Sequence, residues 1–172
     1  RYCTLCQDMR RLLDADAIGQ VKLDFYMGVD FGGGFRHTMP YPVIIDMSIH
    51  HFDPAFNALG IDAPTRVEAR CSQVDSDTIL GVDYVTFRYA ATANRGPINA
   101  YWYNHGLRPA VPLGVDPDDA RQRLGENVDG LLIVGEKGKL MCETYSESPR
   151  LIPAAKMNAY KRPKKTIPRV EG

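Results

Sequence analysis

The chain has little of several features that would assign its class directly. It carries four cysteines among 172 residues, and only Cys3 and Cys6 show the Cys-x-x-Cys spacing of redox and zinc sites. Because Cys71 and Cys142 stand alone, the second pair of a zinc knuckle is lacking, and we predict no metal site. Net charge is lacking as well, since 21 basic residues balance 21 acidic ones. No overall field therefore draws the chain to nucleic acid or to an anionic membrane.

Long apolar runs are also missing from the sequence. No apolar stretch approaches the ~20 residues that a membrane-spanning helix needs, so we expect no membrane partner. A basic-then-apolar leader is not seen either, which makes a cytoplasmic location the default expectation, with an export signal upstream of this sequence left open. With 44% hydrophobic and 24% charged residues, the chain is long enough for one domain with a sizeable core.

An Asp-x-x-x-His-x-x-Asp run at 46–53 is the most informative feature that is present. At about 100° per residue, Asp46, His50 and Asp53 fall within one narrow arc of a helix and would face a cleft. A carboxylate one turn from a histidine can fix the tautomer of the imidazole, which suits proton transfer, whereas a plain surface pair has the same spacing. A second arc is apolar and predicts the buried face of the helix, formed by Ile45, Ile49, Phe52, Phe56 and Leu59.

Asp53 has an alternative role, because Pro54 follows it directly. Asp53 could cap a new helical turn whose first residue is Pro54. We also expect a kink there, since proline cannot donate a hydrogen bond to the carbonyl of His50. Gly60 is predicted to end the helix.

The segment before this helix, residues 32–42, combines three glycines with two prolines. This composition predicts a loop that can approach a ligand closely. Arg36, His37 and Tyr41 are its candidate substrate contacts, and a simple connector is an alternative of similar weight. His105 could also reach a substrate, although a histidine beside a glycine is more often an ordinary turn residue.

Short segments rich in β-branched and aromatic residues predict strands. They combine with the helices into an α+β fold, an open, mostly antiparallel sheet with helices on one face. The second face is expected to be solvated or covered by a partner. Residues 116–121 look like a capped helical turn. The expected strands are 20–27, 65–73, 82–91, 97–103, 130–134 and 139–145.

The run Asp46-Met-Ser-Ile-His50-His51-Phe-Asp53, preceded by 29–34 and closed by 58–60, resembles the catalytic helix of the Gfo/Idh/MocA oxidoreductases. These include glucose–fructose oxidoreductase and inositol dehydrogenase. Residues 9–21, 131–140 and 149–153 resemble the lead-in helix and strand, the late hairpin and a closing segment of that family's C-terminal domain. The resemblance implies a C-terminal domain-like fold and a homo-oligomer built through the sheet face.

The same resemblance implies hydride transfer between NAD or NADP and a sugar, inositol or related polyol. His50 would act as general base, and Asp46 would orient His50 or hold a substrate hydroxyl. Asp53 would be a substrate contact. His51 stands where the inositol-dehydrogenase-like pattern often has an acid, which leaves the substrate class open.

Two parts of the family pattern are absent from the sequence. The Gly-x-Gly-x-x-Gly turn of its Rossmann domain does not occur, nor does its Glu-Lys-Pro lysine. Glu136-Lys137-Gly138 is no substitute, because it lies between apolar strand-like runs and predicts a hairpin turn. We therefore expect a C-terminal piece of a longer protein, inactive alone, with its main cofactor site outside this chain.

The expected organisation has three parts. A helix leading from a nucleotide-binding domain occupies 1–17, a substrate and oligomerisation domain occupies 18–153, and a basic, proline-containing tail occupies 154–172. We expect the tail to be solvated or packed on the domain rather than to bind nucleic acid. Two alternatives to a dehydrogenase stay open, namely an NAD-dependent glycosidase on the same scaffold and a non-enzymatic binding or assembly module.

Overall fold

The computed structural model describes residues 4–21, 25–29, 43–72, 82–104, 107–124 and 129–164. Helices and a sheet occur together in this part of the chain, so the predicted α+β class is confirmed. The elements are, in chain order, α1 (Thr4–Asp14), β1 (Phe25–Val29), α2 (Val43–Leu59), β2 (Arg66–Ser72), β3 (Val82–Tyr89), β4 (Ile98–Asn104), the 3-10 helix η1 (Ala120–Gln122), β5 (Gly130–Val134), β6 (Lys139–Glu143), β7 (Arg150–Ile152) and α3 (Ala154–Ala159).

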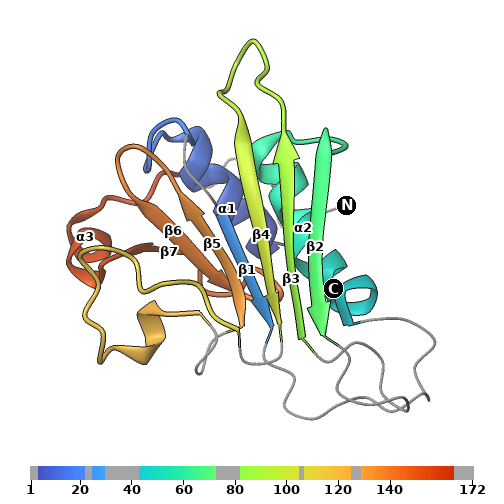
Figure 1. Ribbon diagram of the computed structural model, residues 1–172. Coiled ribbons are helices and arrows are strands. Elements are labelled where there is room, and N and C mark those ends of the chain that lie inside the picture. Colours follow the sequence, from blue (N-terminus) through green and yellow to red (C-terminus); the bar gives the residue numbers. More distant parts are fainter. Residues whose placement is uncertain are drawn as a thin grey trace.

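The strands form one open sheet in the order β2-β3-β4-β1-β5-β6-β7 (Figure 1). Every neighbouring pair is antiparallel except β1 beside β4, which is parallel. The register sets Val29 beside Asn104, Gly28 beside Gly130, and Gly130 beside Glu143. One end of the sheet therefore carries the last residues of β1, β4 and β6 and the first residue of β5. We call this end of the strands the site edge.

Helices α1 and α2 cover the same face of the sheet (Figure 1). Strand β4 shows why, because its side chains alternate between buried and partly buried. Trp102 and Ala100 are fully buried toward the helices, where Met9 and Leu12 of α1 join the same core. The main core thus lies between one face of the sheet and this pair of helices.

The other face of the sheet is divided. Over β5 to β7 the chain covers it with its own segment 107–124, whose Val115 and Leu124 pack on Leu132, Met141 and Ile152. We had expected this face to be solvated or covered by a partner, and for these strands that was wrong. Over β2 to β4 it carries the tyrosine face, which we define as Arg66, Glu68, Tyr84, Arg88, Tyr101 and Tyr103.

Helix α2 follows the prediction in part, because Phe52, Phe56 and Leu59 of the predicted apolar stripe pack against the main core. Ile49 was expected in the core but is 60% exposed, whereas His51 is 1% exposed and Ala55 is fully buried. Residues 51, 55 and 58 recur at helical spacing and are all buried, so they mark the face of α2 that packs into the core. Larger apolar side chains pack beside this buried face. The rings of Phe52 in α2 and Phe87 in β3 lie with their centroids 4.9 Å apart.

The ends of α2 follow the sequence only in part. Gly60 adopts φ +58° directly after Leu59, as expected for a glycine that terminates a helix. Pro54, however, lies inside one continuous helix. Asp53 is therefore an interior residue of α2, and the alternative in which it caps a new turn was wrong.

The predicted hairpin turn at 136–138 is confirmed and has a second contact. Gly135 N–H donates to the carbonyl of Gly138 over 2.8 Å, and Lys137 N–H donates to the carbonyl of Ile18 over 2.7 Å. Strand β1 begins at Phe25 rather than residue 20, because the backbone near residue 18 bonds this turn instead of a neighbouring strand.

Two short helices complete the fold. The capped turn predicted at 116–121 begins with Asp116, whose carboxylate accepts the Asp118 N–H and whose carbonyl accepts the Asp119 N–H. The 3-10 helix η1 starts only at Ala120, and before it Asp119 accepts hydrogen bonds from the Arg121 N–H and the Gln122 side chain. Those bonds, led by the one from Gln122, hold the pKa of Asp119 below its usual value. Helix α3 lies in the range predicted as a tail, and Met157 packs on the main core. Among the described residues, no helix has the length and apolarity to cross a membrane.

Candidate functional site

His50 lies on α2 beside the turn that follows β6. Its side chain is partly buried, and its ring centroid is 4.9 Å from that of Tyr145 at an interplanar angle of 76°. This edge-to-face arrangement is one of the two that aromatic rings prefer, because the positive edge of one ring meets the negative face of the other. Tyr145 comes two residues after Glu143, so His50 stands near the site edge of the sheet.

The turn that carries Tyr145 is held by several hydrogen bonds. Ser146 N–H donates to the carbonyl of Glu143, and Glu143 N–H donates to the carbonyl of Glu147, both over 2.9 Å. Tyr145 N–H donates to the Glu147 carboxylate over 2.8 Å. Ser146 and Ser148 adopt φ +65° and +49°, a region that L-residues enter only when their surroundings impose it.

Below His50, the next residue of α2 faces the core. The ring of His51 meets Trp102 edge-on with centroids 5.7 Å apart, and both side chains are buried. Asn104, at the end of β4, is also buried on this face of the sheet. The two adjacent histidines therefore differ in environment, and His50 is the one with access to a ligand.

The other predicted site residues have different outcomes. Asp46 stands one turn before His50 in α2, but its side chain lies outside what the structure describes. Asp53 is exposed to solvent. The remaining candidates lie outside the described residues, and their roles stay predictions; they are Arg36, His37, Tyr41 and His105.

Sequence reasoning missed two members of this region. Tyr145 was assigned to the end of a strand, and nothing in its neighbourhood links it to a residue 95 positions earlier. His51 was considered only for its charge. A signal for His51 did exist, because the small apolar Ala55 and Ala58 lie on the same face of the helix at helical spacing.

The described residues do not fit the pyrophosphate of a nicotinamide cofactor. Such a group needs a glycine turn that opens onto a helix N-terminus. Gly19, Gly130, Gly135 and Gly138 are crowded by other protein atoms, so their small size serves internal packing. The described glycines with open space are Gly60, Gly96 and Gly114, and none of them begins an α-helix.

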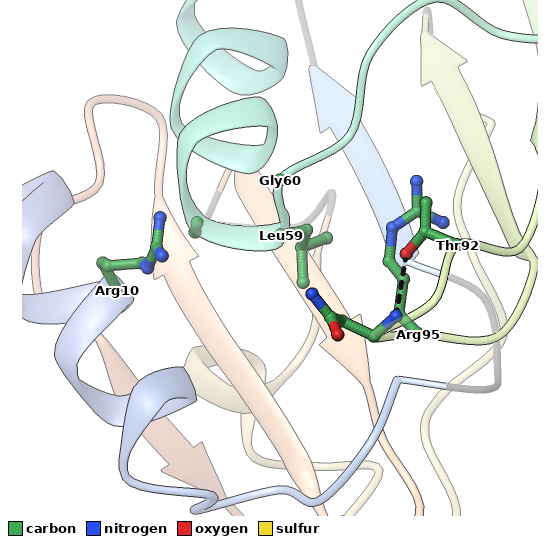
Figure 2. A pocket seen from close by; sticks show the side chains of 7 residues that line it. Arg10, Leu59, Gly60, Thr92 and Arg95 are labelled. Carbon is green, nitrogen blue, oxygen red and sulfur yellow. Dashed lines mark hydrogen bonds between the residues drawn. The ribbon is translucent and has the colours of Figure 1, made fainter.

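A cavity of about 260 Å³ lies at the C-terminal end of α2, next to the β3–β4 connection (Figure 2). Arg10 and Arg95 contribute its cationic side chains, but protein oxygens already engage both. Arg10 donates to the Asn57 carbonyl and to Asp14, and Arg95 donates to the carbonyls of Ala90 and Gly96. These cations fit the negative end of the α2 dipole and the connection, which is a structural role.

Comparisons with known proteins show the fold. No protein-family model matches the chain, and no curated protein matches it. An oxidoreductase from Sinorhizobium meliloti of known structure is similar with a TM-score of 0.51 and 15% identity, over 87% of this chain and 39% of that one.

Weaker similarities have TM-scores below one half. Biliverdin reductase from Synechocystis sp., solved with biliverdin and NADP+, has a TM-score of 0.48 and 14% identity over 86% of this chain and 42% of its own. UDP-N-acetylglucosamine 3-dehydrogenase GnnA from Acidithiobacillus ferrooxidans has a TM-score of 0.47 and 12% identity over 98% and 46%. The chain therefore spans less than half of each of these solved relatives.

Proposed function

We propose that this chain is the substrate-binding and catalytic part of an NAD(P)-dependent oxidoreductase of the Gfo/Idh/MocA type, acting on a sugar, inositol or related polyol. The observation that carries the proposal is His50, a partly buried imidazole held against Tyr145 near the site edge of the sheet. The fold similarity to the Sinorhizobium meliloti oxidoreductase supports the same class.

The proposed contribution of the chain is proton transfer. His50 accepts the proton of a substrate hydroxyl while the carbon that bears the hydroxyl is oxidised. Asp46, one turn earlier, is placed by helical spacing to orient the imidazole or to hold a second hydroxyl. Asp53 lies three residues after His50, and its exposed carboxylate can accept hydrogen bonds from further hydroxyls.

The four remaining candidates come after strands that end in this region. The described residues that flank them include Val29 at the end of β1 and Asn104 at the end of β4, which are neighbours at the site edge. Arg36, His37 and Tyr41 follow the first, and His105 follows the second. We include these four as proposed substrate contacts because their strands end together.

The hydride acceptor is proposed to be NAD or NADP, bound by residues beyond those that the structure describes. When bound, it would supply the acceptor for hydride from the carbon whose hydroxyl proton His50 takes. The described glycines do not form its pyrophosphate site.

His50→Ala tests this function in the protein that carries the chain. Removal of the general base should lower kcat about 10²- to 10⁴-fold. Cofactor binding should stay nearly unchanged, because none of the described residues near His50 forms a cofactor cradle. Steady-state kinetics with sugars and inositols measure the first effect, and nicotinamide fluorescence titration measures the second.

Ile49→Ala is the matched control, since Ile49 is an exposed neighbour on the same helix. It should keep wild-type turnover. Wild-type turnover in His50→Ala would remove the assignment of the general base. Release of a free sugar without net reduction of the nicotinamide would instead indicate the glycosidase.

We also propose that two copies associate through the tyrosine face. Tyr84 stacks on Tyr101 with centroids 6.0 Å apart and contacts Tyr103 at 5.1 Å, so the three rings form one aromatic surface. Glu68 bridges Arg66 and Arg88 beside it. Tyrosine and arginine are enriched in protein interfaces, which supports a homo-oligomer rather than a solvated sheet.

A further inference from the structure

We propose that Tyr145 is a positioning residue for His50, acting through the edge-to-face contact of the two rings. This inference rests on the proposed function, because it concerns how the general base is aimed. Tyr145 is 54% exposed, so the main core does not account for its placement. The contact with the imidazole is the interaction of its ring that the structure describes.

The turn keeps the Tyr145 ring near His50 through its backbone. The Glu147 carboxylate accepts the Tyr145 N–H, and the buried Ser146 anchors the next residue with its own N–H bonded to the Glu143 carbonyl. Two left-handed residues, Ser146 and Ser148, stand one and three positions after the tyrosine. Non-glycine residues in this conformation cost free energy and cluster at active sites, ligand clamps and switch regions.

The other side of His50 is also constrained. His51 is buried against Trp102, which fixes the rotation of α2 at this turn of the helix. The Cα of His50 is thereby placed by the core, and the remaining freedom of the imidazole lies in its side-chain torsions. Because the last torsion of histidine is broad, an adjacent ring is an effective means of restricting it.

The consequence concerns turnover more than binding. A general base works only when its nitrogen lies within hydrogen-bond reach of the proton that it removes. An imidazole free to rotate spends part of its time with that nitrogen misdirected. Loss of the ring contact should therefore lower kcat and change KM little.

Three substitutions in the protein that carries this chain separate the ring from the hydroxyl. Tyr145→Phe keeps the ring, Tyr145→Leu keeps bulk without aromaticity, and Tyr145→Ala removes both. We expect Tyr145→Phe to resemble wild type, and the other two to lose about 10- to 100-fold in kcat, with KM within about threefold. Thermal unfolding checks that each variant is folded.

Protein labelled with ¹³C-histidine provides a readout that does not depend on activity. In wild type and Tyr145→Phe the aromatic ring current should displace the His50 ring resonances, assigned by their absence from His50→Ala. In Tyr145→Leu and Tyr145→Ala this displacement should disappear. Unchanged His50 resonances in these two variants would overturn the inference, and so would a Tyr145→Phe enzyme as impaired as Tyr145→Ala.

The two proposals can fail separately. If His50→Ala retains turnover while Tyr145→Leu still moves the His50 resonances, the proposed function is wrong and the ring contact is supported. If His50→Ala is inactive while Tyr145→Leu has wild-type kcat and resonances, the function stands and the positioning role is wrong.

Discussion

Tyr89 carries a buried phenol at the end of β3, far along the sheet from His50. It is 3% exposed, and its hydroxyl has no hydrogen-bond partner among the described residues. Burial raises the pKa of Tyr89 to about 12, and the opposing effect of Arg95 does not offset it. The ring packs on that of Phe56 in α2. A phenylalanine ring could make the same contact, so this packing does not require the hydroxyl.

Tyr89→Phe should leave the stability at neutral pH unchanged or raise it by about 1 kcal/mol, because it removes a buried polar group without a described partner. The pH dependence has a definite sign. Above pH 10 the unfolded phenol ionises while the folded one keeps its proton, so wild type loses stability as the pH rises from 10 to about 12. The variant should lack this loss, about 1 kcal/mol or more.

Urea unfolding at pH 7 and at several pH values between 10 and 12 measures both effects. Tyr145→Phe is the matched control, since it removes a hydroxyl from an exposed ring and should keep the wild-type alkaline slope. An alkaline slope in Tyr89→Phe equal to that of wild type would contradict the assignment.

At the scale of elements, the rotation of α2 decides which of its side chains are exposed at the site. Its buried residues, His51, Ala55 and Ala58, set the rotation of the helix, and this rotation leaves Ile49 and Asp53 outside. Truncation of Ile49 would cost much more free energy of unfolding if the residue belonged to the core than it should at its exposed position. A pair of substitutions therefore tests the orientation of the helix.

Ile49→Ala should change the free energy of unfolding by less than about 0.5 kcal/mol, since the side chain is exposed and alanine favours helix. Ala55→Leu should destabilise the chain by about 1–3 kcal/mol, because extra methylenes enter a fully buried position of the main core. Denaturant unfolding measures both. A loss of about 2–5 kcal/mol in Ile49→Ala would show that Ile49 belongs to the buried face, as the sequence predicts.

At the scale of the whole molecule, the chain covers one half of the outer sheet face and leaves the other half uncovered. Segment 107–124 covers β5 to β7, and the tyrosine face over β2 to β4 stays uncovered by the described chain. Partial desolvation would raise the pKa of Glu68, but Arg66 and Arg88 outweigh it and lower that pKa. The face thus presents aromatic rings beside charges that are already paired, which suits association with a second copy.

Tyr101→Glu should weaken self-association at least about tenfold, because it would bury an unpaired carboxylate at the centre of the proposed interface. Sedimentation velocity over a range of concentrations measures the change. Val67→Glu is the control, since Val67 is exposed but pairs in register with Phe87 and so points to the opposite face. Equal sedimentation of wild type and Tyr101→Glu would argue against this interface.

The sequence by itself determined the local elements. Alternating and β-branched runs predicted strands that are found at 66–72, 82–89, 98–104, 130–134 and 139–143, and Gly60 predicted the end of α2. The spacing of Asp46 and His50 placed them one turn apart on that helix. These features depend on residues close along the chain, where backbone geometry and side-chain periodicity act directly.

Only the tertiary structure decided which faces these elements present. It buried His51 against Trp102 and exposed Ile49, because α2 packs into the core through the face that carries His51, Ala55 and Ala58. It paired β1 in parallel with β4 across more than seventy residues of chain, and it brought Tyr145 to His50. Such contacts depend on complementary shape between distant segments, and no local pattern in either segment encodes its partner.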